Sequence, residues 1–269
     1  GAFLRPEWLD ELWTPEYSQR NFVDAVGTRP LNGMTWQGWK WGTRPEVDKY
    51  AGDKAEIPSN PVTILPETGT AYRIAGGWDV DRIFLDLGSP DFITAMFEAA
   101  TADYAKKSET FLAADIIAGA SVPPGVPTSL VEALSIAAQA LTAEGAAMTF
   151  VAMAADLWSA FLLLTEDEVP WWLRSQATIN LAGSTTTIAG TSVFVDLSLP
   201  AGTLVAGDRR AVDFRDSGPL RLQALNIPNG GVDIGLVGYQ GTIINDARGV
   251  VAVTIPAIPG ATRSASKAA

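Results

Sequence analysis

Residues 31–77 constrain the fold more than any other part of the chain. They open with TWQGWKWG (35–42), which puts three tryptophans within six residues. A stretch rich in proline, glycine and mixed charge follows, and loops have this composition. VTILPETGTAYRIAGGW (62–78) then predicts one or two returning strands. We therefore predict a long two-stranded excursion, which a compact domain rarely carries without a functional reason.

The tryptophans of this excursion need a cover. Side chains alternate along a strand, so Trp39 and Trp41 are expected on one face and Trp36 on the other. Gly38 is expected to break the strand. Three exposed indoles would present about 450–750 Å² of ring surface, more than a soluble monomer usually leaves bare. The chain's own core, a ligand and a second chain remain three possible covers.

The segment after the excursion predicts a long helix over 89–117. Ser89 is a suitable N-cap, Pro90 fits the first helical position, and Asp91 suits the positive end of the helix dipole. The stretch SVPPGVP (121–127) follows as a boundary. The apolar residues that recur at helical spacing are Phe92, Ile93, Met96, Phe97, Ala100, Tyr104, Phe111 and Leu112.

The rest of the chain predicts two more helices and then many strands. Ser129 and Glu132 fit a capping box for a helix that ends near Gly145. MTFVAM (148–153) has the composition of a buried strand, ADLWSAFLLL (155–164) predicts a further helix, and short β segments with turns begin at residue 178. This order is α+β rather than a repeating βαβ pattern.

The composition excludes several classes of catalytic site. The 269 residues include no cysteine and no histidine, so disulfides, thiolate metal sites, histidine-ligated zinc and a Ser-His-Asp triad are all excluded. The net charge is −11, which argues against tight binding to nucleic acid through clustered Lys and Arg. No apolar run is long enough to span a membrane. We expect no cofactor and no metal site.

One acidic cluster is the strongest catalytic candidate. TEDEVPWW (165–172) places Glu166, Asp167 and Glu168 close to Trp171 and Trp172, as a sugar-binding subsite would. Consecutive carboxylates do not flank a scissile bond from two sides, so a loop after a helix is the favoured interpretation. The motifs AGD (206–208) and NGG (229–231) do not extend to a phosphate-binding loop and predict turns.

The order of these features resembles the major capsid proteins of tailed bacteriophages, which have the Hong Kong 97-type fold. The segment TTTIAGTSVFVDLSLPAGTLVAGDRRAV (185–212) is the closest local match, and the segment from VTILPETG into the long helix is similar to the family's loop return and spine helix. The resemblance implies an N-terminal arm left by cleavage of a precursor, which agrees with a chain that starts at Gly1 without methionine; removal of a tag would leave the same end. It implies an arm at 1–30, an extended loop at 31–77, a peripheral domain at 78–122 and 226–262, an axial domain at 123–225, and a tail at 263–269.

The resemblance also implies function and partners. The chain would self-assemble into pentamers and hexamers of an icosahedral shell around double-stranded DNA, without sequence-specific binding. It would be a virion protein, assembled in the host cytoplasm, and its further partners would be decoration, portal and scaffold or protease proteins. Encapsulins, which enclose protein cargo, share the fold. A tryptophan-rich carbohydrate-active enzyme or lectin is the alternative from another class.

Inter-subunit contacts are expected on the arm and on the extended loop. A narrow apolar stripe predicts a short helix at 6–13, and the charges of the loop are balanced in sign. We expect these residues to contact a neighbouring copy: Trp8, Trp13, Trp36, Trp39, Trp41, Arg44, Lys49, Lys54 and Glu56.

Overall fold

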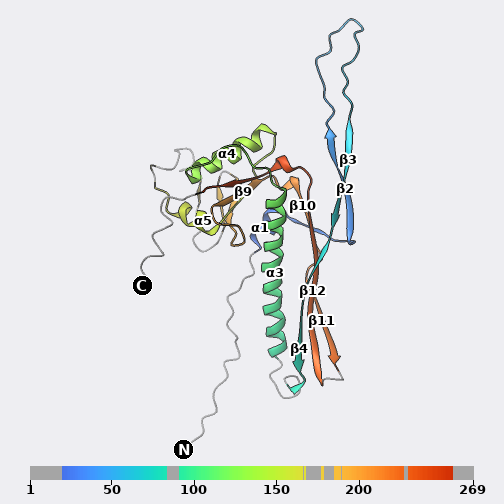
Figure 1. Cartoon of the computed structure of the whole chain (residues 1–269), viewed down its shortest axis with the longest axis vertical. Helices are drawn as coiled ribbons and strands as arrows, with labels where there is room; N and C mark the ends of the chain where they lie inside the picture. The colour runs from blue at the N-terminus through green and yellow to red at the C-terminus, as the bar shows by residue number, and fades with distance from the viewer. Residues whose placement is uncertain are drawn as a thin grey trace, which may run out of the picture.

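A long helix beside a twisted sheet forms the axis of the computed structural model, with a second sheet on one side and a two-stranded ribbon projecting from the top (Figure 1). The structure describes residues 20–83, 91–165, 167, 177–178, 185–188, 190–226 and 230–256. The long helix is α3 (Asp91–Gly119), two residues later at each end than its predicted range. No helix among these residues is long and apolar enough to cross a membrane.

The first sheet has five strands and packs on α3. Its order is β1-β10-β12-β11, with β4 on the free side of β12. The strands are β1 (Thr28–Pro30), β4 (Tyr72–Asp81), β10 (Val212–Asp216), β11 (Leu220–Asn226) and β12 (Gly231–Ile244). Alternate residues of β12 are buried against α3, where Val232, Ile234 and Leu236 form one core cluster with Phe97 and Tyr104.

The second sheet has six strands and carries two helices. Its order is β13-β9-β5-β8-β7-β6. The helices are α4 (Leu130–Ala143) and α5 (Ala155–Leu162). The apolar sides of α4 and α5 cover one face of this sheet, where Leu141, Leu157 and Val151 are fully buried. The strands are β5 (Phe150–Met153), β6 (Ala177–Thr178), β7 (Thr185–Ile188), β8 (Thr191–Val195), β9 (Thr203–Gly207) and β13 (Val250–Thr254).

The two sheets share a core around a short helix near the N-terminal end. This helix, α1 (Asn21–Val26), buries Phe22 completely. The Phe22 ring meets the rings of Phe150 and Phe194 edge-on, with centroids 5.8 and 5.5 Å apart. Two 3-10 turns, η1 (Arg209–Ala211) and η3 (Ala247–Gly249), connect strands of one sheet to strands of the other.

The ribbon consists of β2 (Thr35–Thr43) and β3 (Thr63–Thr70). The expected break at Gly38 is wrong, because β2 runs through Gly38, which pairs with Glu67. The ladder shifts between Trp41 and Thr43 instead. Gly42 lies at this shift, and a Cβ atom on it would come within 2.5 Å of the Thr63 hydroxyl oxygen, so the close approach requires glycine.

Two aromatic residues of α3 are also placed differently from the prediction. Phe92 and Phe111 are both 42% exposed, although their spacing puts them on the expected apolar face. The helix packs on the five-stranded sheet through Phe97 and Tyr104, and on the shared core through Leu112 and Ile116. The buried direction therefore rotates along α3, which leaves Phe92 in the first turn and Phe111 beside the buried Leu112 partly exposed.

The predicted domain ranges do not coincide with the sheets. β1 lies inside the range expected for the N-terminal arm, and it pairs with β10. Residues 72–77 were expected in the loop, yet β4 pairs with β12 along its whole length. β10 and β11 belong to the five-stranded sheet, and β13 belongs to the six-stranded sheet. Hydrogen bonding between distant segments decides which sheet a strand joins, and the local composition of a strand does not reveal its partner.

Candidate subunit interface

The ribbon has one face that packs on its own chain and one face that is bare. Trp36 is half-buried at the root of the ribbon, where its ring lies against Gly69 and Gly241. The Arg215 guanidinium covers this ring, 5.1 Å from the centroid, in a cation–π contact. Glycine is needed at both positions, because a Cβ atom on either would clash with the indole. Trp36 therefore fixes the ribbon to the sheet.

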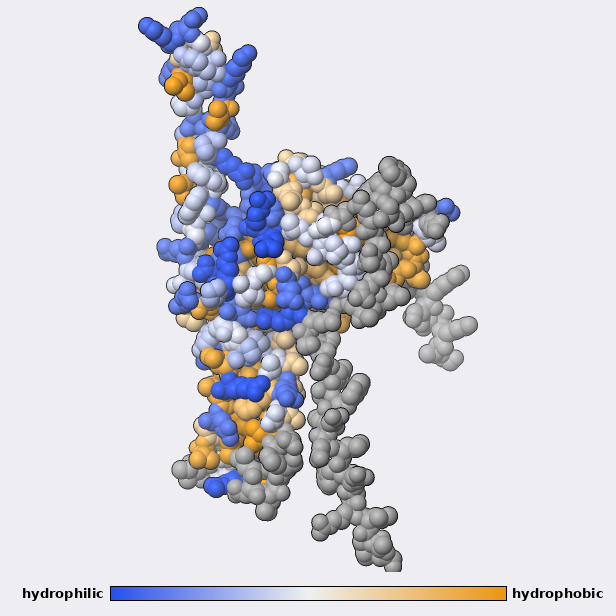
Figure 2. All heavy atoms as spheres, turned by 180° about the vertical axis from the view of Figure 1, so that it is seen from behind, coloured by the Kyte–Doolittle hydropathy of each residue, from blue (hydrophilic) through white to orange (hydrophobic). Residues whose placement is uncertain are grey.

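The opposite face carries the other two tryptophans. Trp39 is 61% exposed and Trp41 is 39% exposed, and their rings meet edge-on with centroids 5.1 Å apart. Trp41 pairs with Ile64, which is also exposed, and Trp39 pairs with Pro66. This face, Trp39, Trp41, Ile64 and Pro66, is called the ribbon face below. In Figure 2 hydrophobic and hydrophilic side chains alternate along the projecting ribbon.

The charged residues of the ribbon divide into braced and free ones. Arg44 forms an ion pair with Asp246, 2.8 Å between Nη2 and Oδ2, and Arg248 binds the same carboxylate at 2.9 Å. These contacts, of which the hydrogen bond from Arg248 has the largest effect, hold the pKa of Asp246 below its usual range. Lys40 pairs with Glu67 on the adjacent strand.

The ribbon ends in a loop that extends beyond the body. The Asn60 side chain closes its base, since its amide donates to the Arg44 carbonyl at 2.6 Å and its oxygen accepts from the Glu46 N–H at 2.9 Å. Lys49, Lys54 and Glu56 lie on this loop and are exposed. Among the described residues, no ion pair involves any of these three side chains.

The predicted contact residues are thus brought together in part. Five of them are exposed in the single chain: Trp39, Trp41, Lys49, Lys54 and Glu56. Trp36 and Arg44 are engaged within their own chain. Trp8, Trp13 and the expected helix at 6–13 lie outside the described residues, as do most residues of the acidic stretch 165–172.

A hollow between the ribbon and the body has tryptophan and carboxylates in its lining, as an enzyme or lectin would require. Its volume is about 1230 Å³, and its carboxylates include Glu67, Asp115 and Asp246. Two of these are held in ion pairs with Lys40 and Arg44, and burial raises the pKa of Asp115, which accepts from Tyr72 at 3.4 Å. The described residues include no group of acidic side chains able to hold a metal ion. Ion pairs therefore engage two of the three carboxylates of this hollow, where the ribbon meets the body.

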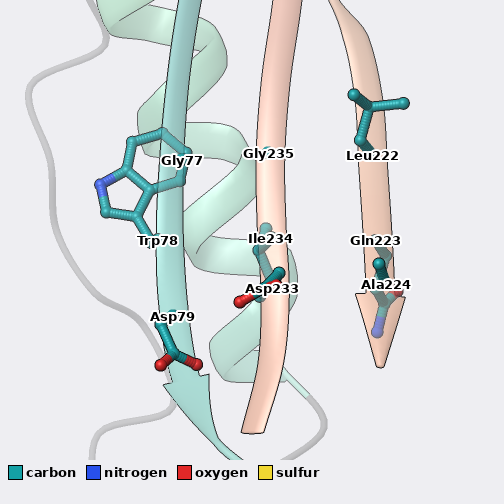
Figure 3. Close-up of a pocket in the computed structure, with 9 residues that line it drawn as sticks. All are labelled: Gly77, Trp78, Asp79, Leu222, Gln223, Ala224, Asp233, Ile234 and Gly235. Atoms are coloured by element: carbon teal, nitrogen blue, oxygen red, sulfur yellow. The ribbon is translucent and has the colours of Figure 1, made fainter. Parts of the chain in front are cut away.

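Sequence reasoning missed a second apolar surface. Gly77 and Gly235 pair across β4 and β12 and form the floor of a groove of about 550 Å³, with Leu222 at one side and Trp78 at the other (Figure 3). Leu222 is 54% exposed and Trp78 is 41% exposed. Figure 2 shows hydrophobic side chains gathered over the lower part of the molecule, where these strands lie. Glycine inside a strand was a sequence signal for bare backbone, but the pairing of Gly77 with Gly235 was not visible in the sequence.

Comparisons with known proteins identify the fold through solved structures. No protein-family model matches the sequence, and no curated protein matches it. Among solved structures, the capsid of a native GTA particle, computed with C5 symmetry, matches with a TM-score of 0.76 at 13% identity over 95% of this chain and 96% of its own. Microbacterium phage Oxtober96 matches with a TM-score of 0.70 at 14% identity, covering 94% and 96%. Mycobacterium phage Che8 matches with a TM-score of 0.67 at 16% identity, covering 94% and 97%.

The chain has the Hong Kong 97-type capsid fold. In this fold α3 is the spine helix and the ribbon is the extended loop, as the sequence predicts. The match spans nearly all of both chains. The exposed ribbon is therefore an element of this fold.

Proposed function

We propose that this chain is the major capsid protein of a tailed-phage-type particle and that it builds a closed shell from copies of itself. The observation that carries the proposal is the full-length match to the GTA capsid chain, which covers 95% of this chain and 96% of that one. The protein would be structural and not an enzyme. Its place would be the virion.

The ribbon face supports this function physically. Obligate interfaces between subunits are large and apolar, and a ribbon of two strands has too little core of its own to be stable alone. The ribbon projects from the body (Figure 1), and in the single chain Trp39 and Trp41 remain 61% and 39% exposed at the hollow beside it. A neighbouring copy is the partner that the fold supplies. The contact is heterologous, and such contacts close into rings such as pentamers and hexamers.

The sheets suggest a domain division for the proposal. The five-stranded sheet with α3 would be the peripheral domain, and the six-stranded sheet with α4 and α5 the axial domain. The extended loop would be residues 31–71. The shell would enclose double-stranded DNA without gripping it, since the net charge of −11 disfavours tight contact with phosphates. Assembly in the host cytoplasm, and decoration, portal and scaffold or protease partners, belong to the same proposal.

Electron microscopy of the purified protein tests the proposal. We expect closed shells or their pentamers and hexamers. A chain that stays monomeric at high concentration, in mild and in high-salt buffers, would overturn it. The contents separate the two kinds of shell, since packaged nucleic acid supports a phage-type capsid and packaged protein supports an encapsulin.

A further inference from the structure

Buried carboxylates outnumber buried cations where the N-terminal end of the described chain meets α3. Glu109, Asp196 and Asp216 are 8%, 4% and 8% exposed. The Arg20 guanidinium donates to Asp216 Oδ2 at 2.9 Å and also contacts the Ser108 hydroxyl. Asp216 thus has a cation bonded to it, and the charge of the same Arg20 guanidinium also acts on Glu109.

Glu109 binds the backbone of the incoming segment. Its Oε1 accepts a hydrogen bond from the Phe22 N–H at 2.7 Å, so this carboxyl joins α3 to the first turn of α1. The charged groups that act on Glu109 are Arg20 and Asp24 from the incoming segment, and Asp196 from the turn after β8. Asp196 accepts from the Ser198 N–H at 2.7 Å through Oδ1, while its Oδ2 is buried with no partner among the described residues.

A buried carboxylate without its own cation is costly when ionised. Burial raises the pKa of Glu109 to about 7, the Phe22 N–H and Arg20 oppose this, and Asp196 and Asp24 add to it. Burial also raises the pKa of Asp196. Burial without a bonded cation and the raised pKa values of Glu109 and Asp196 therefore both indicate that the protonated carboxyl is favoured in the closed joint.

We propose that the junction of residues 20–24 with α3 is a proton-responsive joint, in which Glu109 takes up a proton when the joint closes. The proton resides on one carboxyl oxygen while the other still accepts from the Phe22 N–H. The inference goes beyond shell formation and holds for the single chain.

The direction of the response follows from linkage. When the joint opens, Glu109 meets water and returns to an ordinary pKa of 4.5, whereas in the closed joint its pKa is about 7. The Glu109 proton contributes fully to closure below pH 4.5, where Glu109 is protonated in both the open and the closed joint. This contribution decreases as the pH rises and is lost as the pH passes through 7. Phe22 is buried in the shared core, so the closed form dominates throughout and the proton changes how often the joint opens.

Amide hydrogen exchange tests the joint in the full chain. The readout is the protection factor of the Phe22 amide, corrected for the intrinsic exchange rate at each pH. Between pH 5 and pH 8 we expect it to fall on the order of 10²-fold. Glu109→Gln keeps an acceptor for the Phe22 N–H but cannot ionise, so its protection factor should not change with pH.

Glu98→Gln is the matched control, because Glu98 is exposed on the same helix and its loss should leave the wild-type response intact. A wild-type protection factor that is constant from pH 5 to pH 8 would overturn the proposal without any variant. Equal responses in wild type and Glu109→Gln would overturn it as well. If Glu109→Gln does not fold, Asp196→Asn serves instead: removing this neighbouring charge should move the midpoint of the response to lower pH, and an unmoved midpoint would contradict the joint.

Discussion

Trp36 and Trp39 lie three residues apart on one strand and have opposite surroundings. Trp36 is held between the Arg215 guanidinium and the glycines of two strands, while Trp39 is 61% exposed beside Trp41. Strand alternation causes the difference, because successive side chains point to opposite faces. One tryptophan is therefore an anchor within the chain, and the other two lie exposed on the opposite face.

Gly241 is the residue whose replacement should loosen this anchor. A Cβ atom there would lie 2.6 Å from Trp36 Cη2 and 2.9 Å from the Thr70 carbonyl oxygen. Gly241→Ala should lower the free energy of unfolding by about 1–3 kcal/mol through overpacking. Denaturant unfolding measures it. Gly38→Ala, on the same ribbon with nothing within 4 Å of the added methyl group, is the control and should change stability little.

Single residues show what the sequence can and cannot reveal. The shared face of Trp39 and Trp41 is predictable, because side-chain direction in a strand depends on that strand alone. The partner of Arg44 is not, because Asp246 lies 202 residues further along the chain. The burial of Trp36 likewise depends on Gly241, from a strand that only the fold brings near.

At the scale of elements, the start of α4 shows capping by two side chains. Ser129 Oγ accepts from the Glu132 N–H at 3.2 Å, and Glu132 accepts from the N–H and the hydroxyl of Thr128, both at 2.8 Å. The predicted capping box is therefore modified: the Glu132 side chain binds Thr128, one residue before the N-cap Ser129. These bonds, from Thr128 first, lower the pKa of Glu132.

Loss of this cap should be measurable. Ser129→Ala removes the acceptor for the Glu132 N–H and should cost about 1 kcal/mol of stability. Thermal unfolding followed by circular dichroism measures the change. Ser135→Ala, on the exposed side of the same helix, should be neutral or slightly stabilising. An equal loss in both variants would mean that the cap contributes nothing specific.

The loop beyond Asn60 and Arg44 should matter for assembly and not for folding. Replacing residues 45–59 with an Asn-Gly turn keeps the paired strands and removes Lys49, Lys54 and Glu56. We expect a melting temperature within a few degrees of wild type, because the removed side chains are exposed, together with loss of stable shells. Calorimetry and electron microscopy give the two readouts. Normal shells from this variant would show that the loop is dispensable.

Helices and strands differ in how far the sequence predicts them. The range of α3 was predicted to within two residues, since caps and helical spacing are local signals. Sheet membership was not, because β13 pairs with β9 and β4 with β12 across long stretches of chain. Hydrogen bonds between distant strands leave no trace in the composition of either one.

At the scale of the whole molecule, the ribbon face is the surface whose loss should separate folding from assembly. Trp39→Ser together with Trp41→Ser should lower the stability of the isolated chain modestly, through loss of the edge-on ring pair and of the covered part of Trp41. Assembly should fail, because on the proposed function a neighbour would lose these apolar anchors.

Sedimentation velocity and electron microscopy distinguish these effects. Val122→Ser is the control, because Val122 is 80% exposed and is not part of the ribbon strands. If the double variant assembles as well as wild type, the ribbon face is not the contact. If both variants fail, general loss of apolar surface is the cause.

The fold of the whole molecule was predictable from the order of its segments, whereas its second apolar surface was not. A ribbon, a long helix, a mixed segment and a run of strands already match one architecture. The groove over Gly77 and Gly235 arises only when β4, β12 and β11 lie side by side, so no one of these segments reveals it.

The two-stranded ribbon also has a consequence for the chain before it finds a neighbour. No third strand among the described residues pairs with β2 or β3, so the outer edges of both strands offer free backbone N–H and C=O groups beside an apolar face. Such edges can pair with strands of other chains. We therefore expect the isolated chain to aggregate readily. On the proposed function, subunits made faster than growing particles consume them would precipitate.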